Sequence, residues 1–233
     1  MWACSIPSSR RTSVCPCRGT FPETVRAIAA RGHEIGAHSF LHASPVGVSR
    51  AEEVADFAAT EQALQQVAGV QPRGYRSPAW DRSPNTLSIL AERGYLYDSS
   101  LITEDFHIYR PRTGDVVHAD GRVVFGPTSA LVEFAVAWEL DDFVYFQFIG
   151  KPPLAGLRSA DEVGAIWCAE FDYCVRHVDD GAFTLTMHPE VIGRGPRIAM
   201  PDGLIRRMKE TPGVQFARMR DTAERYDRST AAA

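Results

Sequence analysis

Residues 33–69 read HEIGAHSFLHASPVGVSRAEEVADFAATEQALQQVAG, and this stretch decides the fold class. Its first seven residues alternate and then break into a loop, which is typical of a β-strand. A helix is predicted to follow, because Ser49 can cap its start, Glu52 stands three residues later and Gly69 can end it. A strand followed by a helix is the repeating unit of α/β proteins, and the stretch predicts that class.

The alternation of predicted strands and helices continues along the chain. Residues 21–32 predict a short helix with Pro22 near its start and Gly32 as its stop. Further helices are predicted at 83–94, near 159–178 and from about Asp202. Extended segments are predicted at GYRSPAW (74–80), YLYDSS (95–100), ALVEFAVAW (130–138), AFTLTMHP (182–189) and VQFARM (214–219). Repeated βα units in a chain of this size favour a parallel sheet, open or closed into a barrel.

The length of 233 residues and a hydrophobic fraction of 45% predict one large globular domain, which we place at residues 20–229. Residues 1–19 contain no acidic residue and no hydrophobic period, and we expect a non-native or disordered tail there. The loop-like segment 110–128 predicts a long loop or a small hairpin. Five cysteines without a CxxC pair predict reduced thiols.

Charge and hydropathy argue against several classes of partner. A formal net charge of -4 offers no basic surface for nucleic acid. No stretch approaches the roughly 20 apolar residues of a membrane-spanning helix, and residues 1–20 lack the apolar core of a secretory signal. We therefore expect a cytoplasmic protein that binds neither nucleic acid nor membrane, and we leave homo-oligomerisation open.

Polar and aromatic residues stand where the predicted strands end. In α/β folds, the loops after the carboxyl ends of parallel strands carry the chemistry. These positions predict a shared site that contains His38, Arg76 to Trp80, Asp98, Trp138 to Asp142 and His188.

His38 and His42 form an HxxxH pair at one of these strand ends. Two imidazoles four residues apart can bind one ion when a strand ends at the first and a turn carries the second back. Zn²⁺ or another first-row divalent ion suits imidazole ligands. The spacing alone could also arise by chance, and two histidines need a third ligand, which we expect to be a carboxylate from another strand.

Five segments in this order resemble the polysaccharide deacetylases of the NodB-homology group, carbohydrate esterase family 4. They are GHEIGAHSFLH (32–42), GYRSPAW (74–80), YDSS (97–100), LVEFAVAWELDD (131–142) and LTMHPEVIGRGPRI (185–198). The resemblance covers about residues 20–220, and it includes the bacterial branch of peptidoglycan-deacetylase-like proteins, allantoinases and cyclic-amide hydrolases. It implies a distorted (β/α)7 barrel with a metal held by one aspartate and two histidines.

The resemblance also implies roles for individual residues. His38 and His42 match the metal-binding imidazoles of a site for Zn²⁺ or Co²⁺. Arg76 matches the arginine that tethers a catalytic carboxylate, and His188 matches the general acid that protonates the departing amine. The substrate groove is expected to involve Pro78, Trp80 and Trp138, and Asp98 and Asp142 are expected to support the imidazoles. Each of these residues also has a structural interpretation, as core aromatic, core histidine, solvated charge or helix cap.

The chain departs from the family pattern at its start. The family opens with a strand that ends in an acidic motif, which supplies the catalytic base and the metal-binding aspartate. Residues 1–20 contain no Asp or Glu, so neither acidic role can be assigned to a residue here. We therefore expect an incomplete barrel that lacks its first strand or two, and on this ground we leave enzymatic activity open.

Three functions follow from the sequence as hypotheses. The leading one is metal-dependent hydrolysis of carbon–nitrogen amide bonds, with an N-acetylated saccharide as substrate. A second is hydrolysis of a small cyclic amide or ureide such as allantoin. The third is a non-catalytic remnant that retains metal or carbohydrate binding, because the acidic motif is missing.

Overall fold

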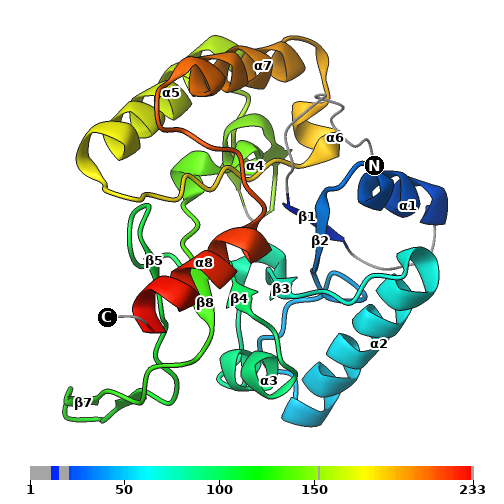
Figure 1. Cartoon of the computed structure of the whole chain (residues 1–233), viewed down its shortest axis with the longest axis vertical. Coiled ribbons are helices and arrows are strands. Elements are labelled where there is room, and N and C mark those ends of the chain that lie inside the picture. Colours follow the sequence, from blue (N-terminus) through cyan, green and yellow to red (C-terminus); the bar gives the residue numbers. More distant parts are fainter. Residues whose placement is uncertain (1–11, 16–20, 152, 232–233) are drawn as a thin grey trace. The chain divides into compact units, whose positions relative to one another are not determined.

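The computed structural model describes residues 12–15, 21–151 and 153–231. Within the span 20–229, which the sequence assigns to one domain, the chain divides into two compact units (Figure 1). Of the described residues, unit 1 contains 102–107 and 135–216, and unit 2 contains 12–15, 21–101, 108–134 and the segment from 217.

Unit 2 is built on a six-stranded sheet in the order β1-β2-β3-β4-β8-β5. The strands are β1 (Thr12–Cys15), β2 (Glu34–Ala37), β3 (Gly74–Tyr75), β4 (Tyr97–Asp98), β8 (Val132–Phe134) and β5 (Ile108–Tyr109). Neighbours from β1 to β8 are parallel, and β5 pairs antiparallel with β8. The predicted α/β class with a parallel sheet is confirmed. In the residues that the structure describes, the edge strands β1 and β5 do not pair with each other, so the sheet does not close into a barrel.

Strand β1 lies inside residues 1–19, for which the sequence predicts a tail. It pairs in parallel with β2. Residues 1–11 and 16–20 lie outside the described part of the chain, so the expectation for those residues stays a prediction.

The described residues of unit 2 form the α-helices α1 (Pro22–Ala30), α2 (Arg50–Ala68), α3 (Thr86–Glu92) and α8 (Met219–Ala231). The start of α2 is fixed by a capping box between Ser49 and Glu52, and its end by Gly69 in the left-handed conformation, as predicted. Phe57 of α2 and Leu90 of α3 are buried with strand residues in a core against the sheet. This packing fixes the strands whose ends carry the candidate residues.

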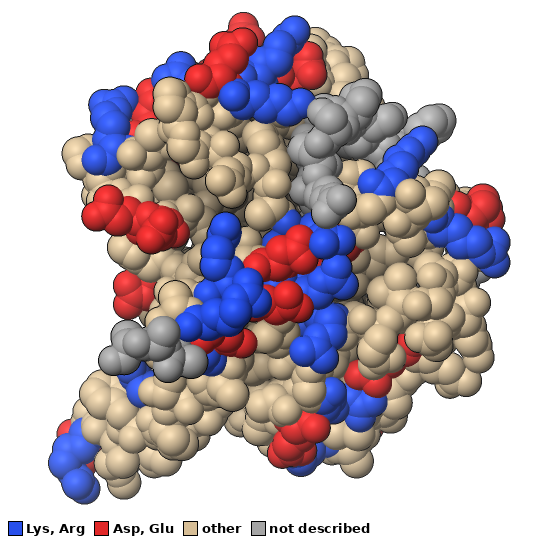
Figure 2. All heavy atoms as spheres, in the orientation of Figure 1, with Lys and Arg blue, Asp and Glu red and all other residues tan. Residues whose placement is uncertain are grey.

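Helix α8 returns the end of the chain to this sheet and packs against β4 and β8 (Figure 1). Buried Glu34 of β2 links helix α8 to strand β4. Its Oε1 accepts a hydrogen bond from the hydroxyl of Tyr97 at 3.0 Å, and its Oε2 accepts one from the backbone N–H of Arg220 at 3.0 Å. Figure 2 shows basic and acidic side chains interspersed on the visible face, and uniformly basic areas are absent among the described residues there.

Unit 1 is mainly helical, with α4 (Asp142–Phe146), α5 (Ala160–His177), α6 (Pro189–Ile192), α7 (Gly195–Glu210), and the antiparallel pair β9 (Phe148–Ile149) and β10 (Leu154–Ala155). Its core surrounds Trp167, which is fully buried and donates from Nε1 to the backbone oxygen of Glu139 at 3.0 Å. The strand predicted at 182–189 is reduced to one parallel bridge between Thr186 and Asp141.

The segment 110–128 of unit 2 forms a hairpin of β6 (Val116–Val117) and β7 (Val123–Val124), in accord with the sequence. Cys168 and Cys174 are free thiols. The helices of the described residues are all too short or too polar for a bilayer crossing.

Candidate functional site

The two histidines of the HxxxH pair lie side by side at the carboxyl end of β2. Their ring centroids are 4.9 Å apart and the ring planes meet at 73°. His38 directly follows the last residue of β2, and its Nδ1 lies 2.6 Å from the backbone oxygen of Arg76. A carbonyl oxygen only accepts, so Nδ1 carries the hydrogen and the lone pair of His38 is on Nε2. The predicted proximity of the two imidazoles is present in unit 2.

The loop that carries these histidines is held in a strained backbone conformation. Ser39 and His42 have φ of 57° and 55°, in the left-handed region that non-glycine residues rarely adopt. Asp56 of α2 fixes the loop, because its carboxylate accepts from the hydroxyl of Ser39 at 3.2 Å and the N–H of Phe40 at 3.0 Å. Strain of this kind persists where surrounding contacts hold it, and it is frequent at ligand sites.

Arg76 follows β3, and its guanidinium is bonded to the end of β4. The residue is 8% exposed, and Nε and Nη2 donate to the backbone oxygen and hydroxyl of Ser99 at 3.0 and 2.7 Å. The next N–H, of Ser77, donates to the hydroxyl of Ser100 at 2.9 Å. The ends of β3 and β4 are therefore joined by side chains as well as by the sheet.

Pro78 and Trp80 were expected to form a groove wall. Both are buried, with Trp80 9% exposed in the short 3-10 turn η1 (Pro78–Trp80). Ala79 and Trp80 have φ of 51° and 58°. The expectation that Pro78 and Trp80 form a groove wall stays a prediction.

Asp98 was expected to support a metal-binding imidazole, but the hydrogen bond described for its side chain comes from Ser100, whose hydroxyl donates to Oδ1 at 2.7 Å. The partner described for Nδ1 of His38 is instead a backbone oxygen. Burial raises the pKa of Asp98 to about 6. Its neighbour across the sheet is Glu133 of β8, fully buried, whose pKa is raised well above 4.5 by burial and by the charge of Asp98.

Asp142 and His188 form a close pair in unit 1. Nδ1 of His188 lies 2.7 Å from Oδ1 of Asp142, and the backbone N–H of His188 donates to both carboxylate oxygens at 3.1 Å. Asp142 is fully buried at the start of α4, where Asp141 caps the helix by accepting from the N–H of Phe143 at 2.7 Å. The carboxylate therefore fixes one tautomer and one orientation of the His188 imidazole. The expectation that Asp142 supports a metal-binding imidazole stays a prediction.

The protonation of the pair reflects unequal burial. Burial lowers the pKa of His188, but the hydrogen bond to Asp142 and the charges of Asp141, Asp142 and Glu190 outweigh it, so the pKa lies above 6.5. The pKa of Asp142 is also raised, because burial of its carboxyl outweighs the hydrogen bond from His188. The His188 side chain is 33% exposed and that of Asp142 is 0% exposed.

Asp141, Asp142 and His188 also have possible ligand atoms within 4.8 Å of one another. Both oxygens of Asp142 already accept hydrogen bonds from His188, and Asp141 caps α4. The hydrogen bonds of this arrangement orient the His188 imidazole, and the same three residues could hold a metal ion. Trp138, in the turn η2 (Trp138–Leu140), is 43% exposed and stays a candidate for contact with substrate.

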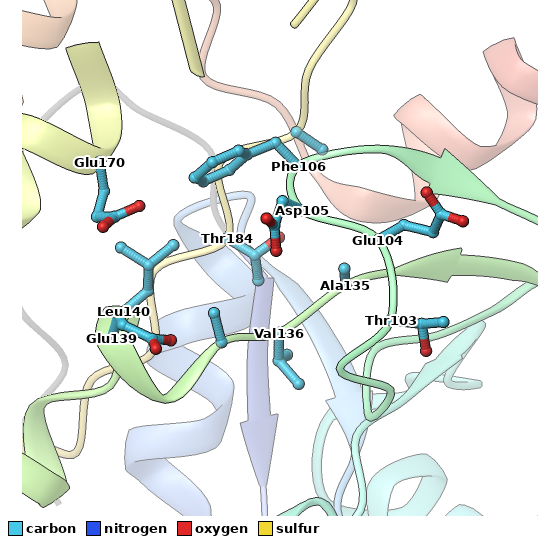
Figure 3. A pocket seen from close by; sticks show the side chains of 12 residues that line it. Thr103, Glu104, Asp105, Phe106, Ala135, Val136, Glu139, Leu140, Glu170 and Thr184 are labelled. Carbon is cyan, nitrogen blue, oxygen red and sulfur yellow. The ribbon is translucent and has the colours of Figure 1, made fainter. Parts of the chain in front are cut away.

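A pocket of about 200 Å³ in unit 1 is distinct from this pair (Figure 3). Four carboxylates stand among its lining residues, Glu104, Asp105, Glu139 and Glu170. Burial and the charges of Glu139 and Asp105 raise the pKa of Glu170. Asp142 and His188 are not among the described residues that line it.

Sequence reasoning missed Glu133, and Asp56 as the residue that holds the histidine loop. The signal for Glu133 was present, because it is a single acidic residue within the apolar run LVEFAVAW. An isolated charge in such a run requires a partner. For Asp56 the sequence gives no comparable signal.

Comparison with known proteins gives consistent matches. Residues 10–97 match the sequence profile of the family described as polysaccharide deacetylase. A peptidoglycan deacetylase of Helicobacter pylori is 30% identical over 89% of this chain and 74% of its own length. A peptidoglycan deacetylase-like protein of Gibberella zeae is 26% identical over 89% of this chain and 67% of its own length.

Solved structures agree with these matches. A protein assigned as a polysaccharide deacetylase from Mycobacterium smegmatis superposes with a TM-score of 0.81 at 33% identity, over 95% of this chain and 73% of that one. An allantoinase superposes with a TM-score of 0.72 over 91% of this chain and 66% of that one. Its identity of 20% shows a shared fold alone.

Proposed function

Because the chain belongs to the polysaccharide deacetylase family, we propose that it hydrolyses the acetamide group of an N-acetylated polysaccharide in a metal-dependent reaction. Peptidoglycan is the polymer of first choice, since the Helicobacter pylori relative is named for it. The observation that carries the proposal is the pair of adjacent imidazoles, His38 and His42, with Nδ1 of His38 bonded to a backbone oxygen.

The donor set of this pair fits a divalent cation. His38 presents Nε2 in a fixed tautomer, and His42 stands on a loop that Asp56 and Ser39 hold in place. Imidazole nitrogens suit Zn²⁺ and Co²⁺. A divalent ion bound there would polarise the acetamide carbonyl.

His188 is proposed as the general acid. Its Nδ1 is engaged by Asp142, so Nε2 is the atom that can transfer a proton to the amide nitrogen as the carbon–nitrogen bond breaks. The raised pKa of His188 keeps the imidazole protonated closer to neutral pH than an unperturbed histidine. A water molecule forms the new bond to the carbonyl carbon and supplies the second oxygen of acetate, while the carbon–nitrogen bond breaks and the protonated nitrogen leaves as a free amine. An amide nitrogen leaves poorly without that proton.

The test is acetate release from N-acetylated peptidoglycan fragments with added Zn²⁺ or Co²⁺, together with calorimetric titration of the metal. His42→Ala should abolish metal binding and activity, whereas His188→Ala should leave metal bound and slow turnover by at least ~10²-fold. His118→Ala in the exposed β6–β7 hairpin is the matched control and should change neither.

Unchanged metal affinity in His42→Ala would overturn the assignment of the ligand. Metal binding without acetate release would overturn the hydrolase and support a binding remnant. Ring opening of a cyclic ureide, with no acetate release from the saccharide, would replace the substrate class.

A further inference from the structure

Two carboxylic side chains face each other across the sheet of unit 2. Asp98 of β4 and Glu133 of β8 are register partners, so their side chains stand on one face of neighbouring strands about 4.8 Å apart. Tyr75 and Tyr109 are the next partners in the same row, on β3 and β5. Asp98 and Glu133 are both 0% exposed, so this is a dry position for two acids.

In each of the two carboxyl groups, one oxygen accepts hydrogen bonds and the other has no described partner. Oδ1 of Asp98 accepts from the hydroxyl of Ser100 at 2.7 Å. Oε1 of Glu133 accepts from the backbone N–H groups of Ser100 and Leu101, both at 3.0 Å. Oδ2 of Asp98 and Oε2 of Glu133 are buried and have no partner in the described part of the chain. Two adjacent buried carboxylates cannot both keep a charge without a large cost in free energy. A proton on one of them neutralises that carboxylate and removes the repulsion.

We propose that Asp98 and Glu133 share a single proton, which Oε2 of Glu133 carries and donates to Oδ2 of Asp98. Each of the two remaining oxygens then has its partner, and the pair has one negative charge instead of two. The charge resides on Asp98, beside the guanidinium of Arg76, whose attraction favours the ionised form of Asp98. Glu133 is a neutral donor that keeps Asp98 in place.

The shared proton makes Glu133 a positioning residue for the segment that begins at Arg76. Ser100 donates its hydroxyl hydrogen to Asp98 and accepts the N–H of Ser77 on the same oxygen. The chain of hydrogen bonds therefore runs from Glu133 through Asp98 and Ser100 to the backbone next to Arg76. The backbone oxygen of Arg76 in turn accepts a hydrogen bond from Nδ1 of His38.

Few other charges face the pair. From β3 it meets Arg76 and Tyr75, and from β5 it meets Tyr109. Helices α2 and α3 contribute apolar side chains to this core. The carboxylates of α2 near Tyr75 belong to Glu53 and Asp56. Glu53 accepts hydrogen bonds from Ser83 and Thr86, and Asp56 accepts hydrogen bonds from the histidine loop. Arg218, just before α8, and Arg220 and Asp221 of α8 lie on the side of Glu34. At neutral pH, Arg76 is therefore the charge that matters most to the pair.

The sign of the pH dependence follows from the raised pKa values. Burial raises the pKa of both groups, for Asp98 to about 6 and for Glu133 above 4.5. The folded protein thus binds more protons than the unfolded chain, and this contribution to stability is full below about pH 4 and is lost as pH rises through 6 and beyond.

The experiment uses the full chain and compares Glu133→Gln, Asp98→Asn and the matched control Glu23→Gln, an exposed residue of α1. In Glu133→Gln the amide can donate the bond that the proton made. We expect its Tm to stay within about 2 °C of the parent at pH 6, and its Tm to fall less than that of the parent between pH 5 and pH 8. Asp98→Asn removes the carboxylate that accepts from Ser100 and replaces it with an amide, and it should lower Tm by about 4 °C or more.

Infrared spectroscopy of the folded parent supplies a readout that packing alone does not move. At pH 7 the parent and Glu23→Gln should show the carbonyl band of a protonated carboxylic acid, and Glu133→Gln should not. The proposal is wrong if the parent lacks this band, or if Glu133→Gln keeps it. A larger loss of Tm in Glu133→Gln than in Asp98→Asn would place the proton on Asp98 and overturn the assignment. These readouts need no activity, so they remain decisive if the proposed hydrolysis fails.

Discussion

Replacement of Gly74 by alanine should destabilise the protein through a steric contact with the ring of Tyr97. A Cβ added to Gly74 would lie 1.8 Å from Cζ of Tyr97 and 2.2 Å from both Cε atoms. The ring cannot easily move, because Tyr97 is 1% exposed and its hydroxyl donates to Glu34. Inserting one carbon into a packed core costs about 1–3 kcal/mol, and a contact this short predicts the upper end, about 3 kcal/mol.

Thermal unfolding provides the assay. A loss of about 3 kcal/mol corresponds to a fall in Tm of about 6–12 °C in a protein of this size. The matched control is Gly203→Ala in α7, where an added Cβ meets nothing within 4 Å. This second replacement should raise stability by about 0.5–1 kcal/mol, because glycine is unfavourable inside a helix. The same chemical change thus has opposite signs at two positions.

A double-mutant cycle identifies the contact itself. Leucine at position 97 lacks the Cε and Cζ atoms that the new carbon would meet. Gly74→Ala should therefore cost much less in a Tyr97→Leu background than in the parent. Equal costs in the two backgrounds, or an unchanged Tm in Gly74→Ala, would refute the placement of the ring over Gly74.

Three further changes test other parts of the structure. Asp142→Asn removes the strongest influence that raises the pKa of His188, so an NMR titration should show a lower pKa for the imidazole. Acetate release should slow by about 10²-fold or more. An unchanged pKa of His188 in the titration would contradict the pairing. Trp167→Phe removes side-chain volume and the hydrogen bond to the backbone oxygen of Glu139. Chemical denaturation should show that the free energy of unfolding falls by about 1–3 kcal/mol. An unchanged free energy of unfolding would contradict the central place of Trp167 in its core. Glu170 has a pKa raised by burial and by its acidic neighbours, so its charge opposes folding at high pH; Glu170→Gln should raise Tm at pH 8 and leave it nearly unchanged at pH 4, and the reverse pattern would contradict the repulsion.

Local sequence signals predicted the helices that have strong caps. The Ser49, Glu52 and Gly69 pattern fixed α2, and the helix predicted near 159–178 is present as α5. The prediction was wrong for α7, which begins at Gly195 and continues through Pro201 instead of starting near residue 202. A proline has no N–H to donate to an intrahelical hydrogen bond, so Pro201 in the sequence favours a helix that starts near it. Packing of the surrounding residues can override that preference.

The candidate site could be predicted where its geometry is local. His38 and His42 lie four residues apart, and a turn suffices to bring their rings together. The contact between Asp142 and His188 spans 46 residues. The strand-end positions and the family resemblance indicated that both residues belong to a site, but no local pattern predicted that they contact each other. Burial of Trp80 depends on the left-handed turn at Ala79 and Trp80, which no residue preference at those positions signals.

The bond between Glu34 and the backbone of Arg220 joins positions 186 residues apart, and it sets an order for folding during synthesis. On the ribosome, Glu34 emerges long before α8 exists, so its carboxylate and the surface of β4 and β8 that α8 will cover stay exposed while most of the chain is made. The first half of unit 2 therefore cannot bury this surface until α8 has been synthesised.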